Sequence, residues 1–453
     1  MKKTQNTFYP TLIKLALPIA LQNLLAFAIN FTDNLMVGTL GDVTISGVFM
    51  ANNVHLLLQL LVSGVSASLL ILAAQYWGKH EVEHIRSITS ICLKASACVG
   101  IIFTVLSVGF PSFTIGLMTN DPAVLSVAVP YLRTLGFSFL FFSITQILLS
   151  SLYSIENVKT GMFVSLFLLF FNAALNYVLI FGMFGFPRYG AVGAAIATTV
   201  SRGMEMLIIM VYIFVVDKRL GMRLAHLRSF DTVLAKDLLR YGGPVVLGEI
   251  VWSANAFTYN AVIGRFGADE MAAFSIVGIM NTLVYVWISG LAAAVGIITG
   301  KMVSSCKNLD EIRQHSRRVQ RLFLLVGLVS GLFIFFTKDI LISFYTITSS
   351  AAETAAQLMI VLSVTIMGTC YQMPSLAGLV KAGGNTSFVF KNDTIFVFLI
   401  VIPSAIIAML LNAPAWVVFA CLKCDQILKC AVAVVVVNRY RWVHDLTVKE
   451  SLE

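Results

Sequence analysis

The candidate functional residues of this chain are a few polar side chains that lie within long apolar stretches of the sequence. Asp33 lies in the second half of the first stretch. Asn172 and Asn176 are spaced i, i+4 in a later stretch and therefore face the same side of a helix, and Thr198 lies in the next one. Where such stretches cross a bilayer, a central charge costs at least about 2.5–3.5 kcal/mol, so these residues are functional candidates.

The chemistry open to Asp33 is the binding of a proton or a sodium ion. Burial disfavours the charged form of a carboxylate, and Asp33 would regain stability by taking up either cation. The two asparagines on one stripe indicate a polar pocket, to which Thr198 would add a hydroxyl group. Structural alternatives stay open: a carboxylate hydrogen-bonded to a neighbouring helix, and a hydrogen-bonded pair of asparagines between helices.

A second set of candidates lies in the second half of the chain, and these residues would bind an organic ligand. Glu249 and Trp252 are one helical turn apart, and a carboxylate beside an aromatic face suits a lipophilic cation. Tyr259 is the third candidate for substrate binding. The alternative for Glu249 is a carboxylate that packs helices together or acts in gating.

Opposite charges also occur in pairs within the apolar stretches. Asp425 and Lys429 are spaced i, i+4, and Arg202 and Glu205 are spaced i, i+3. At these spacings the two side chains are neighbours on a helix surface, so each pair is expected to neutralise itself. A functional role for Asp425 stays open.

Motifs of enzymes and metal sites are absent, and we predict neither catalytic residues nor a cofactor. The sequence contains no HExxH and no GxSxG, and Gly296 to Lys301 is one residue too short for a nucleotide-binding loop. Cys421 and Cys424 form a single pair without the second pair or histidine that a metal site needs. We interpret both cysteines as small buried apolar residues.

The composition indicates a membrane protein. Apolar residues make up 58% of the chain and charged residues 12%, whereas a soluble domain carries roughly 25% charge. Reading apolar stretches of about 20 residues as membrane spans predicts twelve of them. They cover residues 12–36, 46–76, 88–111, 123–153, 161–185, 190–216, 238–264, 271–301, 320–343, 354–380, 387–411 and 413–438. We expect the first of these to be a retained span rather than a signal peptide.

The distribution of basic residues predicts the orientation. They cluster in every other loop, and the loops between carry only Arg188, Arg265 and Lys338. The basic clusters include Lys2, Lys3, Lys79, Arg86, the segments 218–240 and 301–321, and Lys449. The positive-inside rule then places both termini in the cytoplasm of a multi-pass protein of the cell (plasma or inner) membrane. We interpret the net charge of +9 as attraction to lipid headgroups and not to nucleic acid.

The chain matches itself at one constant shift, which indicates a duplicated unit. Leu17-Pro18 falls on Gly243-Pro244, and the same shift places Ser63-Gly64 on Ser289-Gly290. A duplicated unit in a membrane chain is a common ground plan of transporters. We predict an N-lobe at 1–217 with six helices, a cytoplasmic linker at 218–235 and a C-lobe at 236–453. Pro18 and Pro244 are predicted hinges, because proline removes a backbone hydrogen bond.

The two copies differ at the candidate positions. The shift aligns Asp33 with Tyr259, Asn172 with Phe398, and Asn176 with Ile402. The scaffold is therefore shared, whereas the polar pocket belongs to one copy. We expect the coupling ion to bind in the N-lobe.

The sequence resembles a known family, the multidrug and toxic compound extrusion (MATE) transporters, over essentially its whole length. The resemblance is carried by Leu17-Pro18, Asp33-x-x-x-x-Gly38, Gln75-Tyr76-Trp77-Gly78, Asn172-x-x-x-Asn176 and the segment 193–198. It implies an all-α membrane fold of twelve transmembrane helices in two six-helix lobes, related by a pseudo-two-fold axis along the membrane normal. It also implies antiport by alternating access, in which organic cations are exported in exchange for protons or sodium. The alternative is export of another small molecule or a lipid-linked substrate on the same fold.

The resemblance implies that Asp33, Asn172, Asn176 and Thr198 form the cation pocket of the N-lobe and would hold Na⁺ or a proton. The family sometimes has aspartate where Asn176 stands, so this pocket contains a single acid. A sodium site known from the C-lobe of some members is not carried over, because the segment 368–372 contains no acid. We expect a monomer that contacts membrane lipid and small-molecule cations.

Overall fold

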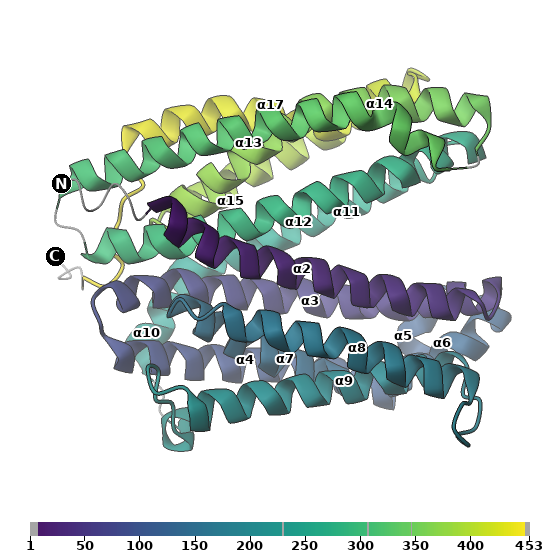
Figure 1. Ribbon diagram of the computed structural model, residues 1–453, viewed down its shortest axis with the longest axis horizontal. Helices are drawn as coiled ribbons and strands as arrows, with labels where there is room; N and C mark the ends of the chain where they lie inside the picture. The colour runs from purple at the N-terminus through teal and green to yellow at the C-terminus, as the bar shows by residue number, and fades with distance from the viewer. Residues whose placement is uncertain (1–7, 229–230, 306–307, 346, 449–453) are drawn as a thin grey trace. The chain divides into compact units, whose positions relative to one another are not determined.

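Helices account for all regular structure in the part of the chain that the computed structural model describes, residues 8–228, 231–305, 308–345 and 347–448 (Figure 1). The one isolated β-bridge there, between Gly384 and Val443, belongs to no strand. Lys2, Lys3 and Lys449, which entered the prediction of orientation, lie outside the described residues. The predicted all-α class is confirmed.

The first half of the chain supplies six predicted spans. Its helices are α2 (Phe8–Gly38), α3 (Asp42–Gly78), α4 (Val82–Gly109), α5 (Pro111–Gly116), α6 (Pro122–Leu135), α7 (Phe137–Ser154), α8 (Lys159–Phe181), α9 (Ala191–Val211) and the π-helical η1 (Tyr212–Val216). The predicted span 123–153 is interrupted at Gly136, where α6 ends and α7 begins. Gly136 packs closely on α4, because an added Cβ would lie 2.8 Å from the Cβ of Ser107.

The second half supplies the other six. After the short helices η2 (Leu224–Arg228), α10 (Thr232–Asp237) and η3 (Leu238–Gly242), its helices are α11 (Gly243–Ile263), α12 (Ala268–Ser305), α13 (Leu309–Ser343), α14 (Ser349–Met373), η4 (Pro374–Lys381), α15 (Thr386–Ile395), η5 (Phe396–Val401), α16 (Ile402–Leu410) and α17 (Ala415–Arg439). Ten helical segments of the described chain are long and apolar enough to cross a membrane. The two predicted spans outside this set are α11 and α17, which carry more polar residues.

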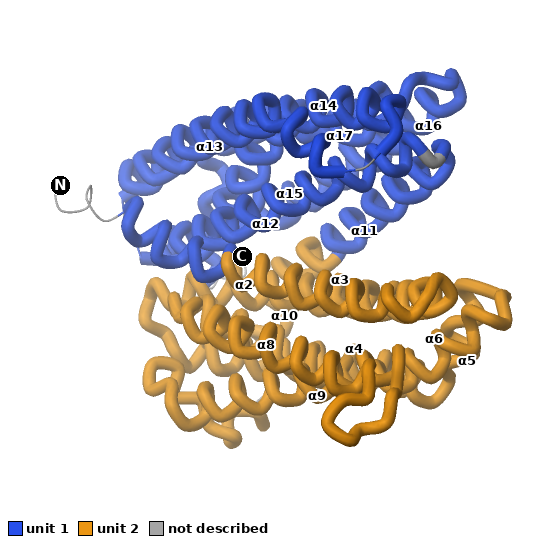
Figure 2. The backbone as a smooth tube through the Cα atoms, turned by 45° about the vertical axis from the view of Figure 1, so that its right-hand side comes forward, with its two compact units in different colours: residues 1–20, 247–453 blue, residues 21–246 orange. Residues whose placement is uncertain are grey.

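By its internal contacts the chain divides into two compact units (Figure 2). Unit 1 comprises residues 1–20 and 247–453, and unit 2 comprises residues 21–246. The breaks lie two residues after Pro18, inside α2, and two residues after Pro244, near the start of α11. The predicted lobe boundaries at 217 and 236 stay a prediction.

The repeated glycines at 64 and 290 make the same contact once in each unit. In unit 2, a Cβ added to Gly64 of α3 would lie 2.8 Å from the Cα of Val246 in α11. In unit 1, a Cβ added to Gly290 of α12 would lie 2.7 Å from the backbone nitrogen of Ala20 in α2. Neither position has room for a side chain. Since the shift that aligns Gly64 with Gly290 also aligns Ala20 with Val246, the contact follows the repeat.

Each unit has its own apolar core. In unit 2 the core includes Leu58, Leu132 and Phe139, and in unit 1 it includes Leu358 and Phe419. Cys421 and Cys424 are half-buried and pack against a smaller apolar cluster of unit 1, so they are apolar contacts as predicted but less buried than predicted.

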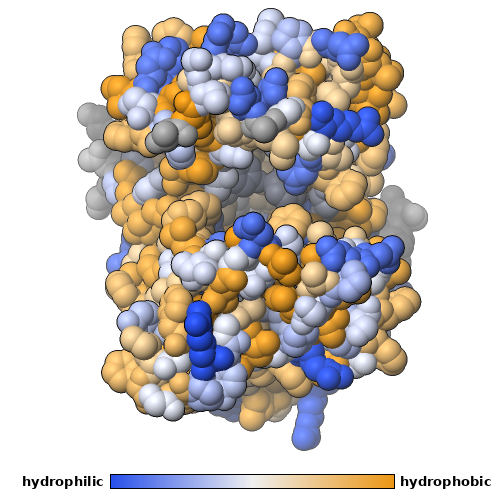
Figure 3. Space-filling view, turned by 90° about the vertical axis from the view of Figure 1, so that its right-hand side faces the viewer, coloured by the Kyte–Doolittle hydropathy of each residue, from blue (hydrophilic) through white to orange (hydrophobic). Residues whose placement is uncertain are grey.

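Large apolar side chains also cover the outside of the helices. Phe163 and Phe170 of α8 are 60% and 69% exposed, and Leu325 of α13 is 59% exposed. Such side chains are expected where helices face lipid, since the backbone hydrogen bonds of a helix are satisfied within it. On the face shown in Figure 3, hydrophilic residues are scattered among apolar ones.

Candidate functional site

The carboxylate of Asp33 receives hydrogen bonds from two other helices of unit 2. Asp33 lies in the last two turns of α2. Asn176 of α8 donates from Nδ2 to Oδ1 of Asp33, and Thr198 of α9 donates from Oγ1 to Oδ2 at 3.4 Å. Helix α2 therefore meets the consecutive helices α8 and α9, which lie far along the chain, at one acid.

The two asparagines of α8 continue this network. The Nδ2 of Asn176 also donates to Oδ1 of Asn172 at 3.1 Å, and the Nδ2 of Asn172 donates to Oγ of Ser201 at 3.3 Å. Asn172 and Asn176 are buried, as the i, i+4 spacing and their polarity require. We call Asp33, Asn172, Asn176, Thr198 and Ser201 the Asp33 cluster.

One acceptor in the Asp33 cluster has no partner among the described residues. It is the buried side-chain oxygen Oδ1 of Asn176. Exchanging the oxygen and nitrogen of this amide would not help, because its nitrogen already donates to oxygens of both Asp33 and Asn172. A buried acceptor left unpaired costs about 1–3 kcal/mol. A cation or a protonated carboxyl group would satisfy it.

The chemistry of the donor set fits a monovalent cation. The cluster offers one carboxylate, two amide oxygens and two hydroxyl groups, and no group of three or more His, Cys, Asp or Glu side chains that could hold a metal ion occurs in the described chain. A single negative charge balances one proton or one sodium ion. Hard oxygen ligands suit sodium, and the cluster lacks the imidazole and thiolate ligands that zinc and copper prefer.

Arg202 adds a fixed positive charge beside the cluster. It lies one turn after Thr198 on α9, pairs with Glu205 at 2.8 Å and lies over the ring of Phe142 at 5.3 Å from the centroid. The predicted pairing of Arg202 with Glu205 is confirmed. Because Glu205 is buried and paired, Asp33 remains the acid of this region that is bonded only to neutral donors.

Sequence reasoning missed two residues of unit 2. Ser201 follows Thr198 at i+3, and two hydroxyl groups at that spacing on a predicted span were an available signal. His55 of α3 packs its ring against Phe139 and Phe142 at 5.5 and 5.1 Å, and its Nδ1 is buried without a partner in the described chain. Its position within the predicted span 46–76 could have identified His55 as a candidate, because histidine is rare in membrane spans.

Unit 1 contains a group of three charges, which we call the Lys429 triad; Asp425 and Lys429 are buried, and Asp393 is partly exposed. The ammonium of Lys429 lies 3.1 Å from Asp425 on the same helix, α17, and 2.8 Å from Asp393 on α15. The predicted i, i+4 pair is therefore confirmed, and Asp393 is an acid that the sequence analysis missed. The position of Asp393 within the predicted span 387–411 could have identified it as a candidate, because acids are rare in membrane spans.

Amide groups complete the surroundings of the triad. Gln426 donates to both carboxylate oxygens of Asp425 at 3.0 Å and accepts hydrogen bonds from Thr369 and Gln372 of α14, each at 3.0 Å. Asp425 and Lys429 have side chains only 2% and 7% exposed. Two carboxylates and one ammonium leave the triad with one net negative charge, and the side chain of Asp393 is 33% exposed.

The three residues predicted to bind substrate lie along α11. The Oε1 of Glu249 is 3.7 Å from the Nζ of Lys381, the last residue of η4, so its charge has a partner within unit 1. Trp252 is 48% exposed. The ring of Tyr259 lies 5.5 Å from the ammonium of Lys423. Substrate binding by these residues stays a prediction.

Comparison with known proteins gives a consistent result. The family model MatE matches residues 18–178 and 244–407, two segments that begin at the aligned prolines Pro18 and Pro244. The probable multidrug resistance protein NorM of Listeria monocytogenes is 24% identical over 334 residues, 73% of this chain and 72% of its own length. The protein of the same name from Thermotoga maritima is 27% identical over 337 residues, 74% of this chain and 72% of its own.

Solved structures share the fold. A MATE protein crystallised in complex with MaL6 is 19% identical, with a TM-score of 0.85 and 95% of both chains covered. A MOP superfamily transporter from Pyrococcus furiosus is also 19% identical, with a TM-score of 0.84 and 95% of both chains covered. At this identity the likeness concerns the fold, and it extends over nearly the whole chain.

Proposed function

The chain belongs to the MatE family of multidrug efflux transporters, and on that premise we propose that it exports organic cations in exchange for protons or sodium ions by alternating access. It is a multi-pass membrane transporter of small molecules and not an enzyme. The observation that carries the antiport proposal is the Asp33 cluster, in which one carboxylate faces only neutral hydrogen-bond donors. The proposed location is the cell membrane, with both termini in the cytoplasm.

The proposed coupling site is the Asp33 cluster. A proton on Asp33 would make the carboxyl group a donor toward the unpaired oxygen of Asn176, once the two side chains reorient. A sodium ion would instead be held by oxygens of Asp33, Asn172, Asn176 and Thr198. In both cases the bound ion removes the net charge of the acid and satisfies the acceptor.

The proposed exchange is a competition for the negative charge. An organic cation is attracted while Asp33 is ionised, and it is released once the coupling ion has neutralised that carboxylate. When the ion leaves on the other side of the membrane, the charge is restored for the next substrate. Pro18 and Pro244 are the proposed hinges, since proline donates no backbone hydrogen bond; Pro18 lies inside α2, and Pro244 lies at the start of α11, directly after η3.

A single acid also limits the driving force. A proton that enters with the membrane potential gains about 2.3 kcal/mol per 100 mV. If one monovalent cation leaves for each proton or sodium ion, these voltage contributions cancel, and only the concentration gradient of the ion drives export. A transporter that uses the Asp33 cluster alone is therefore expected to be electroneutral for monovalent substrates.

Dye efflux from proteoliposomes tests the antiport directly. Liposomes containing the purified protein are loaded with a fluorescent cationic dye, and a proton or a sodium gradient is imposed separately. We expect one of the two gradients to accelerate dye exchange well above the rate in protein-free liposomes. Dye movement that is indifferent to both gradients would contradict ion-coupled export, and acceleration of a lipid-linked or anionic cargo alone would favour the alternative substrate class.

Glu249 gives a test of the proposed substrate site. Glu249→Gln leaves the ammonium of Lys381 without its partner, so repulsion should weaken export of monovalent cationic dyes by roughly 5- to 10-fold, corresponding to about 1–1.4 kcal/mol of lost attraction. Lys381→Gln removes the positive charge and should raise export of the same dyes. Resistance of cells to a panel of cationic compounds measures both effects.

The sign of the two effects separates the alternatives for Glu249. An electrostatic role in substrate binding predicts opposite changes in the two variants. Equal losses in both variants would show that the ion pair itself matters, and Glu249 would then be a packing or gating residue.

A further inference from the structure

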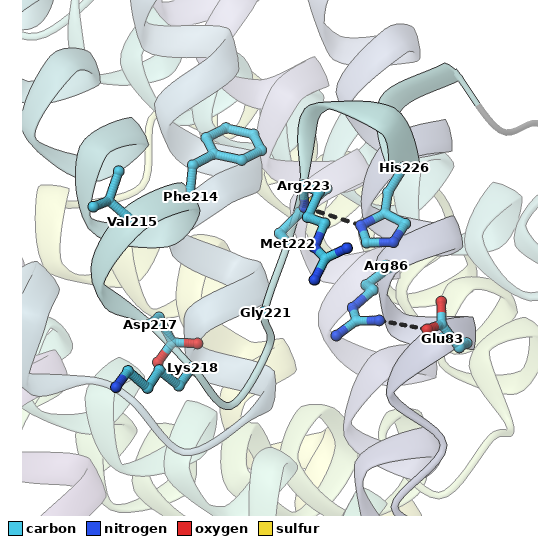
Figure 4. A pocket seen from close by; sticks show the side chains of 10 residues that line it. All are labelled: Glu83, Arg86, Phe214, Val215, Asp217, Lys218, Gly221, Met222, Arg223 and His226. Atoms are coloured by element: carbon cyan, nitrogen blue, oxygen red, sulfur yellow. Dashed lines mark hydrogen bonds and ion pairs between the residues drawn. The ribbon is translucent and has the colours of Figure 1, made fainter.

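A cavity of about 500 Å³ opens at one end of unit 2, and none of the residues that line it belongs to the Asp33 cluster. Its walls are the first turns of α4, the π-helical η1 and the segment 217–226 that follows it (Figure 4). We call it the linker pocket. Because it lies where the last span of unit 2 ends, it is placed at the level of a membrane surface.

The lining of the linker pocket is positively charged. Arg86, Lys218 and Arg223 supply three cations against the two carboxylates of Glu83 and Asp217, which leaves one positive charge. Both carboxylates are already engaged: Glu83 accepts from Arg86, and Asp217 pairs with Arg219 at 3.4 Å. Within the described residues, the side chains of Lys218 and Arg223 form no ion pair.

Arg86 is held in place before any ligand binds. Its Nε donates to the carbonyl oxygen of Leu220 at 2.7 Å, and its side chain is only 19% exposed. Gly221 has a φ of +52°, and a Cβ there would lie 2.9 Å from Nη2 of Arg86. The glycine therefore lets the chain turn closely over the guanidinium.

A second guanidinium, that of Arg223, lines the same pocket as Arg86. In Figure 4 the side chains of Arg223 and Arg86 both extend into the space between the segment 217–226 and α4, whereas Glu83 lies on the other side of Arg86. Like charges repel, so two guanidinium groups that line one pocket are stabilised by an anion bound in it. Arginine pairs bind phosphate oxygens with two parallel hydrogen bonds each.

Apolar side chains beside the pocket indicate where such a phosphate comes from. Val215 and Val216 of η1 are 74% and 55% exposed, and Leu224 is 68% exposed. Side chains of this kind at the end of a span suit the acyl chains of a lipid, while a basic pocket at that level suits its headgroup. A soluble phosphate would make no use of them.

We propose that the linker pocket binds the phosphodiester headgroup of an anionic phospholipid, with Arg86 and Arg223 on the phosphate and Lys218 at the rim. The site ties the segment that connects the two halves of the chain to the lipid surface. It does not depend on the antiport proposed above.

Native mass spectrometry of the full chain in detergent tests the proposal. The first molecule of dioleoylphosphatidylglycerol should bind more tightly than dioleoylphosphatidylcholine. Arg223→Gln should weaken phosphatidylglycerol binding about fivefold, which corresponds to about 1 kcal/mol per basic residue at an anionic surface, and should leave phosphatidylcholine binding unchanged. Because Arg223 is exposed, the variant is expected to fold normally.

Two further variants make the test specific. Lys236→Gln removes the same charge from an exposed position on α10 outside the pocket and should change binding less than twofold. Gly221→Ala keeps every charge but displaces Arg86, and it should weaken binding as Arg223→Gln does. The proposal is overturned if both lipids bind equally, if Lys236→Gln has the same effect as Arg223→Gln, or if Gly221→Ala has none. Displacement of the lipid by millimolar inorganic phosphate would overturn the assignment to a lipid.

Discussion

Replacement of Asp33 by asparagine is expected to abolish ion-coupled export, reducing gradient-driven dye efflux to the rate of protein-free liposomes. The amide group of asparagine does not take up a proton at physiological pH, and it lacks the negative charge that would balance a sodium ion. The fold should persist, because the side-chain oxygen of asparagine can still accept a hydrogen bond from Asn176 or Thr198. We expect a cost of about 1 kcal/mol in the free energy of unfolding for the altered hydrogen bonds.

The control for Asp33→Asn is Asp42→Asn in the same unit. Asp42 is an exposed acid in the first turn of α3, so this substitution removes one carboxylate without touching the Asp33 cluster. It should retain coupled efflux. Unchanged coupling in Asp33→Asn, with both variants present in the membrane at equal levels, would remove the coupling role from Asp33.

Replacement of Lys429 by methionine is expected to cause the largest loss of stability, about 3–5 kcal/mol. The ammonium of Lys429 lies 2.8 Å from Asp393 and 3.1 Å from Asp425, and its removal leaves the buried carboxylate of Asp425 and the partly exposed carboxylate of Asp393 without their cation. Breaking a buried ion pair costs this much because the remaining charge has lost both water and partner. Thermal unfolding in detergent, followed by tryptophan fluorescence, measures the loss.

Two companion variants test whether charge is the cause. Lys391→Met removes an exposed lysine from α15, near Asp393 in sequence, and should change the unfolding temperature little. The triple variant with Asp393→Asn, Asp425→Asn and Lys429→Met should recover most of the stability, because replacing a whole buried ion group is often nearly neutral. A triple variant as unstable as Lys429→Met would assign the loss to packing of the lysine stem instead.

The sequence predicted which residues of unit 2 belong together, but not how they are bonded. Asp33, Asn172, Asn176 and Thr198 lie on three helices, and the structure brings all four into one hydrogen-bonded cluster. Their coupling role stays a proposal. The unpaired oxygen of Asn176, which makes the cluster suited to a cation, depends on how the amide is oriented and has no signature in the sequence.

Pairings between distant helices were the part that the sequence could not supply. Asp425 and Lys429 were matched correctly because a spacing of i, i+4 is a local property of one helix. Asp393 and Lys381 were missed as partners of Lys429 and Glu249, since these contacts join separate helices. Which helix faces a given side chain depends on the rotation of both helices about their axes, and a single sequence does not record it.

The sequence by itself determined the helical membrane fold, the spans and the duplication, because apolar length and a match of the chain to itself at a constant shift are patterns along the chain. Only the tertiary structure showed that Gly64 and Gly290 pack closely against the backbone of Val246 and Ala20, respectively. It also showed that the carboxylate of Asp33 accepts a hydrogen bond from the amide of Asn176 on a separate helix. The physical reason is that burial of apolar surface favours many helix arrangements, whereas close backbone contacts and buried hydrogen bonds are satisfied in few of them.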